Sequence, residues 1–333
     1  MPAEWEKHDA IWLAWPHDRL TFPRLNKAED AYAAIVKNIY KSELVNLFVK
    51  DAKMLKRVKI HLKKYKVDFK KINFWVHKYS DVWFRDYGPI FVVNKEKKTL
   101  AMTKWIFNAW GNKYKVLLYD NIVPNIINQK LKLKCFKPEM VLEGGSIDVN
   151  GSGTLITTEQ CLLNKNRNPK LKKKDVENYL CEYFGVSNII WLKEGIEADD
   201  TDGHVDDIAR FVGQKTVVCA FGDDPRDKDY KALKENYEIL RNSKDQDGKS
   251  FRVVKLPMPD CRDKKGKLPA SYTNFYIGNK VVLVPVFMHR NDKKALKILQ
   301  ELFPARKVIG IDCRYVVCGL GTLHCISQQQ PRP

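Results

Sequence analysis

The segment that decides the fold is Ile208–Ala220, which reads IARFVGQKTVVCA. Two runs of apolar and β-branched residues flank the turn residues Gly213, Gln214 and Lys215, so the segment predicts a β-hairpin. Three further segments repeat the order of strand, turn and strand, and a helical pattern follows each hairpin. The other predicted hairpins are Ile90–Met102, Ser146–Thr158 and Phe275–Val284.

The helical patterns place apolar residues at i, i+3 and i+4, as at Val176, Tyr179 and Leu180. The predicted helices span residues 27–43, 51–64, 115–130, 172–184, 228–243 and 291–303. Strand pairs that alternate with helices predict an α/β chain built from repeated ββαβ-like modules, which we expect to form one catalytic domain over residues 1–333.

The N-terminal strand Ala10–Trp15 has no hairpin of its own. We expect it to pair with the C-terminal segment Cys325–Ser327. This pairing would close a ring of modules and remove exposed sheet edges.

The composition describes a folded and basic protein. Its 333 residues are 44% hydrophobic, and 59 Lys plus Arg against 40 Asp plus Glu give a formal net charge of +19. Such a charge attracts polyanions, so a non-catalytic protein that binds nucleic acid or an anionic membrane is one alternative. The lysine-rich stretches at 63–66, 170–174 and 264–267 are dispersed and carry no nucleic-acid-binding signature. We therefore favour a solvated lysine surface, with neither nucleic acid nor membrane as partner.

The sequence also predicts a compartment. Its N-terminus lacks the basic and apolar regions of a secretory signal, and no apolar run reaches the roughly 18 residues of a membrane span. The eight cysteines include no C-x-x-C pair, so neither a disulfide framework nor a cysteine zinc site is predicted. Cys313 and Cys318, the closest pair, are interpreted as strand residues. We expect a protein of the reducing cytoplasm.

One polar or reactive side chain stands just before each hairpin and before the C-terminal strand. These residues are Asp86, Glu143, His204, Asn274 and Cys325, at intervals of roughly 50 to 70 residues. Equivalent positions in modules arranged about a pseudo-symmetry axis converge on one point. The sequence therefore predicts that these side chains form a central site.

The residue types at this site indicate a chemistry. A thiol beside an imidazole is a nucleophile with an acid–base partner. Carboxylates beside a thiol raise its pKa and disfavour an anionic electrophile, so they indicate a cationic substrate. A planar guanidinium fits because carboxylates pair with its N–H groups in a bidentate manner. The implied reaction is attack of the cysteine on a guanidinium carbon, loss of ammonia and hydrolysis.

Nine segments along the chain carry a further signal. They are PAEWEKH at 2–8, WLAWP at 12–16, WFRDYGP at 83–89, FNAWG at 107–111, LEGGS at 142–146, LLNKNRNP at 162–169, TDGHVD at 201–206, ASYTNFY at 270–276 and HCISQQQP at 324–331. In content and order they resemble the agmatine deiminases, which belong to the guanidine-modifying superfamily that includes bacterial-type peptidylarginine deiminases. The resemblance covers almost the whole chain.

The resemblance implies a five-bladed α/β propeller, the pentein fold. It implies an enzyme of polyamine biosynthesis that hydrolyses the small cationic substrate agmatine to N-carbamoylputrescine and ammonia, with neither a metal nor an organic cofactor. Cys325 would be the nucleophile, and His204 the general acid and base. Related enzymes also lead us to expect a homo-oligomer, a dimer or higher.

Further roles follow from the same resemblance. Asp86 and Asp206 would clamp the guanidinium. Glu143 would hydrogen-bond on the His204 side and to a substrate nitrogen, and Trp83 would wall the aliphatic chain of the substrate.

Other residues near these motifs keep two interpretations. Asn274 and Trp110 fit pocket lining and scaffold equally. His324 favours a structural role, because neighbours in a strand point to opposite faces. The acidic residues Asp199, Asp200, Asp202 and Asp207 either include a partner for the distal amine or only enrich the rim.

The chain departs from the resemblance just before the nucleophile. Related agmatine deiminases commonly read Gly-Gly-Asn-Ile-His-Cys there, whereas residues 320–325 read LGTLHC. The nucleophile is intact, but fine substrate preference stays open. A deiminase of peptidyl-arginine or free arginine is the nearer alternative to agmatine.

Overall fold

Four modules follow one another along the chain of the computed structural model, which describes residues 1–264 and 266–333. Each has two antiparallel strands, a helix and a third strand that runs parallel to the second. The first module consists of β4 (Ile90–Asn94), β5 (Thr99–Thr103), α5 (Val123–Leu131) and β6 (Lys134–Phe136), and the second of β7 (Asp148–Val149), β8 (Thr154–Thr158), α7 (Lys173–Phe184) and β9 (Asn188–Leu192). The third consists of β10 (Ala209–Gly213), β11 (Thr216–Phe221), α8 (Tyr230–Asn242) and β12 (Arg252–Pro257). The fourth consists of β15 (Tyr276–Ile277), β16 (Val281–Val286), α9 (Asp292–Leu302) and β17 (Lys307–Asp312). The predicted ββαβ order is confirmed.

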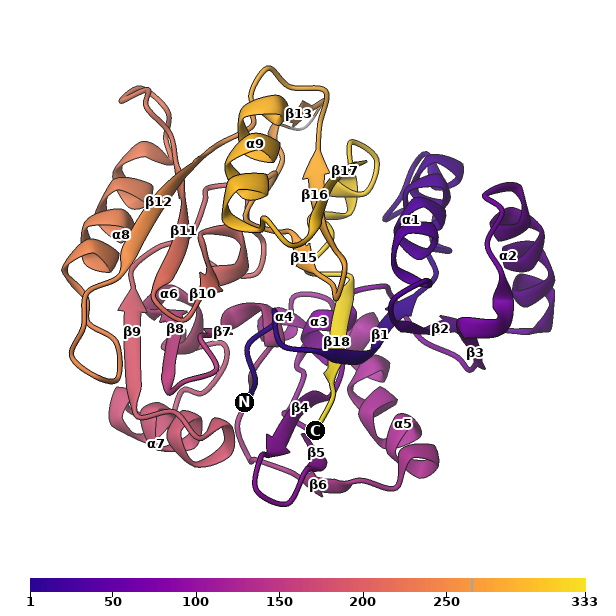
Figure 1. Cartoon of the computed structure of the whole chain (residues 1–333), viewed down its shortest axis with the longest axis horizontal. Coiled ribbons are helices and arrows are strands. Elements are labelled where there is room, and N and C mark those ends of the chain that lie inside the picture. Colours follow the sequence, from indigo (N-terminus) through magenta and orange to yellow (C-terminus); the bar gives the residue numbers. More distant parts are fainter. Residues whose placement is uncertain (265) are drawn as a thin grey trace.

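A fifth module takes its strands from both ends of the chain (Figure 1). The C-terminal β18 (Ser327–Pro331) pairs antiparallel with β1 (His8–Ala14), and Leu13 faces Ser327. After α1 (Leu25–Ile39), β2 (Leu44–Val49) runs parallel to β1, and α2 (Ala52–Lys64) and β3 (Ile72–Val76) extend the sheet. The predicted pairing of the ends is therefore confirmed, although β18 begins two residues after Cys325.

Local sequence explains where several helices begin and end. Asp51 caps α2, because its carboxylate accepts a hydrogen bond from the backbone N–H of Met54 at 2.7 Å. Gly185 ends α7 in the left-handed region at a φ of 66°. The helix predicted over 115–130 is a 3₁₀ segment, η2 (Lys115–Ile122), followed by α5. Pro124 lies in the first turn of α5, where its missing N–H costs no helical hydrogen bond.

Some shorter expectations need correction. Cys313 and Cys318 are not strand residues: Cys313 follows β17, and Cys318 lies in η5 (Val317–Gly319). Lys265, in the third lysine-rich stretch, lies outside the described residues. A short hairpin of β13 (Arg262–Asp263) and β14 (Gly266–Lys267) precedes the last module.

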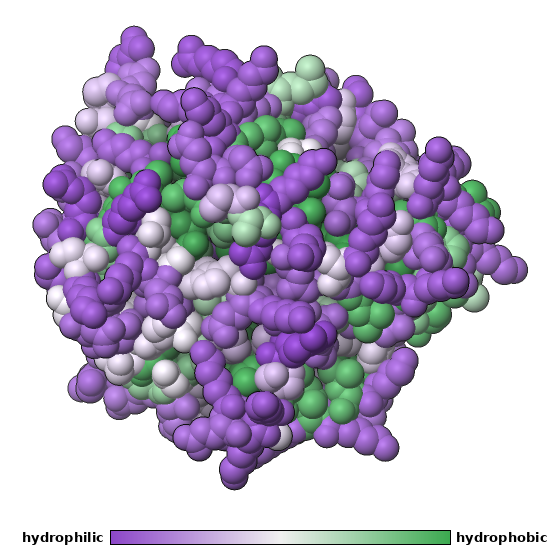
Figure 2. Space-filling view, viewed as in Figure 1, coloured by the Kyte–Doolittle hydropathy of each residue, from purple (hydrophilic) through white to green (hydrophobic). Residues whose placement is uncertain are grey.

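The apolar core consists of three clusters of buried side chains, which pack between the sheets and the helices of the modules. The largest of them joins β1, β2 and α1 to β15 and β16. Figure 2 shows hydrophilic residues over most of the visible face, as a solvated lysine surface predicts. Within the described residues, every helix is too short or too polar to cross a bilayer.

Short helical turns precede the first strands of three modules. They are α3 (Phe84–Tyr87), η3 (Gly144–Ser146) and η4 (Val205–Asp207). α3 contacts η3, and η3 contacts η4, although they lie far apart in the sequence. α3 lies near the middle of Figure 1, with the modules around it. Asp86 and Asp206 lie in these turns, and Glu143 and His204 lie directly before η3 and η4.

Candidate active site

Cys325 lies in a buried turn before β18 and is 6% exposed. Asn274 Nδ2 donates a hydrogen bond to Cys325 Sγ at 3.0 Å, and Asn274 Oδ1 lies 3.3 Å from the backbone nitrogen of Cys325. Burial and the charges of Asp206 and Asp207 raise the pKa of the Cys325 thiol well above its ordinary value. A cation bound beside the thiol would favour the thiolate.

His204 stands at the start of η4 and is 1% exposed. Its Nδ1 lies 3.7 Å from Asp86 Oδ1, and its Nε2 lies 3.9 Å from Glu143 Oε2. Neither ring nitrogen has a hydrogen-bond partner within the described part of the chain. Burial opposes the imidazolium, but Asp86, Cys161 and Glu143 raise the pKa of His204 well above its ordinary value. The ring is therefore a protonated donor with free nitrogens.

Asp86 is held from two sides. Trp110 Nε1 donates to its Oδ2 at 3.0 Å, and the backbone N–H of Gly145 donates to its Oδ1 at 3.1 Å. A Cβ on Gly145 would lie 2.6 Å from His204 Nδ1 and 2.9 Å from Asp86 Oδ1, so only glycine fits there. Burial, together with the charges of Asp206 and Glu143, raises the pKa of Asp86 to about 6.

Trp110 reaches Asp86 from an unusual turn, α4 (Ala109–Asn112). Four successive residues have φ values of 53°, 53°, 82° and 63°, all in the left-handed region. Residues other than glycine pay conformational energy there, on the order of 1–2 kcal/mol each. Asn108 stabilises the turn, because its Oδ1 accepts from the backbone N–H of Gly111 at 2.8 Å. This strained turn holds the Trp110 indole against the Asp86 carboxylate.

Asp206 is fully buried, and its two oxygens differ. Oδ2 lies 2.7 Å from His324 Nδ1 and 3.7 Å from Cys325 Sγ, whereas Oδ1 has no hydrogen-bond partner in the described residues. Burial raises the pKa of Asp206, but His324 holds it below the ordinary value. Asp206 therefore presents one free, charged oxygen.

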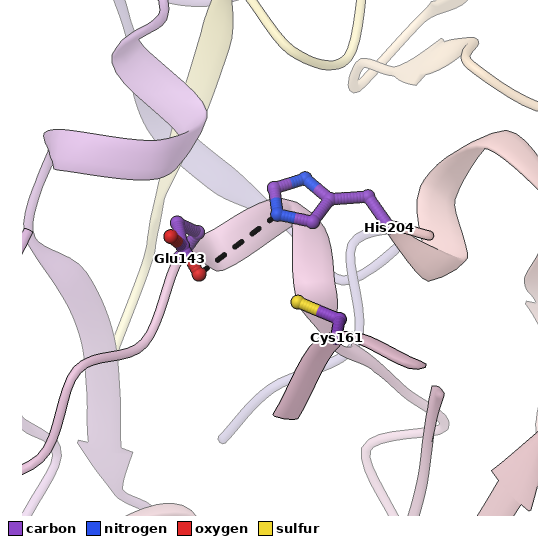
Figure 3. Close-up of side chains that lie close together, drawn as sticks. All are labelled: Glu143, Cys161 and His204. Carbon is purple, nitrogen blue, oxygen red and sulfur yellow. Dashed lines mark ion pairs between the residues drawn. The ribbon is translucent and has the colours of Figure 1, made fainter. Parts of the chain in front are cut away.

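Glu143 is bound to an arginine that the sequence analysis had given no role. Arg167 Nε donates to Glu143 Oε1 at 2.8 Å, and both side chains are fully buried. Although burial opposes it, Arg167 holds the pKa of Glu143 below its ordinary value. Cys161 completes this cluster, and Figure 3 shows its thiol beside Glu143 and His204. Arg167 lies in the quoted segment 162–169, and that segment was the available signal.

Trp83 packs against the segment that precedes the nucleophile. Its Nε1 donates to Asp81 Oδ2 at 3.1 Å. A Cβ on Gly321 would lie 2.5 Å from the Trp83 indole and 3.1 Å from Cys325 Cβ, so this glycine is required. Leu320, which stands where relatives commonly have glycine, has a φ of 74°. The departure from the family pattern therefore introduces backbone strain beside the site.

His324 is not a strand residue, so the alternation argument about it was wrong. Residues 323–326 form a turn before β18. The His324 ring lies between Asp206 and Glu4, at 2.7 Å and 2.9 Å. Glu4 belongs to the quoted segment 2–8 but had no predicted role.

The acidic residues near the site already have partners. Arg167 and Lys113 pair with Asp202, and Lys113 also lies 3.7 Å from Asp200. Asp199 accepts backbone N–H groups from its own loop. Asp207 accepts from Asn274 Nδ2 at 3.0 Å. Each of the four therefore has a partner among the described residues.

Two groups of side chains within the described residues have the composition of metal ligands. They are Glu143, Cys161 and His204, and Asp206, Asp207 and Cys325. Both belong to the cluster described above, and Arg167 already neutralises Glu143. The donor set fits an organic cation, which needs several carboxylates and a nearby thiol, better than it fits a resident metal.

The site brings together a buried thiol, a protonated imidazole and several carboxylates in an α/β fold. This combination is that of an enzyme rather than of a binding module. The chain belongs to the Porphyromonas-type peptidyl-arginine deiminase family, whose model matches residues 1–331.

Individual relatives resemble it over their whole length. A Legionella pneumophila protein curated as a candidate agmatine deiminase is 38% identical, over 100% of this chain and 95% of its own. The solved agmatine deiminase of Enterococcus faecalis is 32% identical, with a TM-score of 0.92 over 100% of this chain and 95% of its own. A cysteine-to-serine variant of the C. jejuni agmatine deiminase, solved with substrate bound, is 34% identical, with a TM-score of 0.88 over 99% and 95%.

Proposed function

We propose that this protein is an agmatine deiminase, which hydrolyses agmatine to N-carbamoylputrescine and ammonia in polyamine biosynthesis. The observation that carries the proposal is the buried Cys325 thiol, which carboxylates surround and a protonated imidazole accompanies. An uncharged or anionic electrophile gains nothing from such a pocket, whereas a guanidinium compensates its negative charge. The names of the relatives support agmatine as the guanidine.

The first step forms a covalent bond to the enzyme. The bound guanidinium stabilises the Cys325 thiolate, and the sulfur adds to the guanidinium carbon. Asp86 and Asp206 hold the N–H groups of the substrate, so that attack is effectively unimolecular. His204 donates its proton to one nitrogen, the C–N bond breaks, and ammonia leaves behind a thiouronium.

The second step releases the product. Neutral His204, oriented by Glu143, removes a proton from a water molecule, and the oxygen adds to the thiouronium carbon. The C–S bond then breaks, Cys325 leaves as thiolate, and the remaining hydroxyl proton passes to solvent as the carbon becomes the carbonyl of a ureido group. We propose that Trp83 walls the aliphatic chain, and that Trp110 and Asn274 fix Asp86 and Cys325 respectively.

One experiment tests the activity and the substrate together. Purified wild-type protein and Cys325→Ser are assayed for ammonia release from agmatine, free arginine and an arginine peptide. We expect release from agmatine by the wild type only. Preference for arginine or the peptide would move the assignment to the other deiminases of the family, and unchanged release by Cys325→Ser would refute the mechanism.

We further propose that the five modules form the blades of one pseudo-symmetric propeller, in a single domain. Support comes from five sheets with a common strand order, and from contacts of β18 with β4 and of β7 with β10. An amidinotransferase from Microseira wollei, 11% identical with a TM-score of 0.53, supports the fold alone. An experimental structure would test the arrangement of the blades.

We also propose that the protein works in the cytoplasm. The eight cysteines are all free, as a reducing cytoplasm requires. We propose a dimer or higher oligomer, which light scattering of the purified protein would measure.

A further inference from the structure

His324 joins Asp206 to a carboxylate from the N-terminal segment. His324 Nδ1 lies 2.7 Å from Asp206 Oδ2, and His324 Nε2 lies 2.9 Å from Glu4 Oε2. All three residues are 5% exposed or less. Both hydrogen bonds are therefore shielded from competing water.

These contacts fix the protonation of the ring. An ionised carboxylate only accepts hydrogen bonds, so each contact requires a proton on His324. Burial opposes ionisation of Glu4, but Arg210 and His324 hold its pKa well below the ordinary value. Asp206 is ionised for a similar reason, since His324 outweighs its burial. With both carboxylates ionised, His324 carries two ring protons and is an imidazolium.

The charges around His324 agree with this state. Arg210 Nη2 lies 2.5 Å from Glu4 Oε2, and Arg210 Nε lies 3.2 Å from Asp148 Oδ1. Arg85 Nε donates to the His324 backbone carbonyl at 3.3 Å, and Arg85 Nη2 lies 3.9 Å from Glu4. The groups that face His324 are thus the carboxylates of Glu4, Asp148 and Asp206, the guanidinium groups of Arg85 and Arg210, and the adjacent Cys325 thiol. A protonated His324 makes this buried group of carboxylates and cations neutral.

We propose that Glu4 and His324 are positioning residues, which hold Asp206 so that its Oδ1 receives the substrate guanidinium. This inference rests on the proposed function. His324 occupies Asp206 Oδ2, so the other oxygen is left buried and without a partner in the described residues. Glu4 keeps the imidazolium in place, and the Ile277 backbone N–H and Arg210 in turn hold Glu4. The N-terminal segment thereby sets the geometry of the clamp.

The first experiment reads the protonation of His324 without any assay of activity. In protein labelled with ¹⁵N-histidine, NMR at pH 7 should show two proton-bearing ring nitrogens for His324. The signals are assigned by their loss in His324→Gln or by their shift in Glu4→Gln. An unprotonated ring nitrogen on His324 at pH 7 would overturn the proposal.

The second experiment removes the anion that faces the ring. Glu4→Gln keeps the shape of the side chain but has one accepting oxygen where Glu4 has two, which accept from Arg210 and from Ile277, and its neutral amide no longer stabilises the imidazolium. We expect kcat/KM for agmatine to fall about 10- to 100-fold. The ring-nitrogen signals of His324 should also shift, because Nε2 loses the anion that accepts from it.

Asp148→Asn is the matched control. Asp148 pairs with the same Arg210 but makes no hydrogen bond to His324, so this variant should retain most of the activity and the wild-type ring-nitrogen signals of His324. Equal losses of activity in the two variants, with unchanged His324 signals in both, would overturn the proposal and assign Glu4 to folding alone. If the wild type does not release ammonia from agmatine, the proposed function fails, whereas the NMR result still decides the state of His324.

Discussion

Two buried histidines each lie between two carboxylates, His204 between Asp86 and Glu143 and His324 between Asp206 and Glu4, and they differ in the distance to those carboxylates. His204 has carboxylate oxygens at 3.7 Å and 3.9 Å, and both of its nitrogens are unbonded in the described structure. His324 has them at 2.7 Å and 2.9 Å. About one ångström per contact separates a ring that can give its proton to a ligand from a ring whose protons are already shared. The residue type alone does not determine the role of a buried histidine.

The largest effect is expected from removing the unbonded ring. His204→Asn should lower kcat for agmatine about 10²- to 10⁴-fold, because it removes the proposed general acid and base. Its melting temperature should also fall at pH 7, because Asp86 and Glu143 lose the imidazolium that compensates their charge. Ammonia release and thermal unfolding measure the two effects. If His204→Asn lost no more activity than Glu4→Gln, the different roles assigned to His204 and His324 would be wrong.

The next largest effect is expected from replacing Arg167, the cation that binds Glu143 beside His204. Arg167→Met leaves a buried carboxylate without its main cation, and breaking such a pair costs about 3–5 kcal/mol of stability. Denaturant unfolding measures this loss. A matched variant, Arg167→Lys, restores the charge but not the planar fork that binds Glu143 and Asp202, so we expect partial rescue. Full stability in Arg167→Met would contradict the assignment.

The role of Asp86, which also lies beside His204, can be tested by the pH dependence of the activity. Its pKa is about 6, so the carboxylate that we propose to bind the guanidinium forms as pH rises, and kcat/KM should increase through pH 6. Asp86→Asn should reduce kcat/KM by about 100-fold and abolish that rise.

Stability should move in the opposite direction at this position. Burial raises the pKa of Asp86 above that of the unfolded chain, so its favourable contribution exists at low pH and is lost as pH rises through about 6. At pH 8 the ionised group therefore destabilises the fold, and Asp86→Asn should melt no lower than the wild type. A clearly lower melting temperature would show that Asp86 is needed for folding.

The smallest effect is expected at Cys161, the second thiol near His204. Cys161→Ala removes one influence that raises the pKa of His204, but no bond to the substrate is proposed for it. We expect kcat to change by less than about tenfold, against near-complete loss in Cys325→Ser. Measured side by side, the two variants identify the nucleophile. A total loss in Cys161→Ala would reverse the assignment.

The sequence was most informative where the modules repeat. The sequence predicts Asp86, Glu143 and His204 as site residues because each lies at the same place in its module, shortly before the first strand. Asn274 and Cys325 occupy the corresponding places, and the structure brings their side chains within 3.0 Å. A repeat converts sequence position into spatial position.

The remaining contacts follow no repeat. Glu4 and His324 are separated by almost the entire chain, and no spacing rule connects them. Arg167 approaches Glu143 from a loop whose path depends on the packing of the second module. His324 lies in the turn at residues 323–326, so the alternation of neighbouring side chains does not apply to it, because two-residue periodicity holds only inside a strand.

The pairing of β1 with β18 has a consequence for how the protein is made. A ribosome produces β1 early and β18 only after all the modules between them, so the N-terminal sheet must wait for its edge strand while the other modules fold. Cys325 emerges with β18. The reactive thiol therefore joins the carboxylates in the last step of assembly, and a nascent chain with most of its core in place is still catalytically silent.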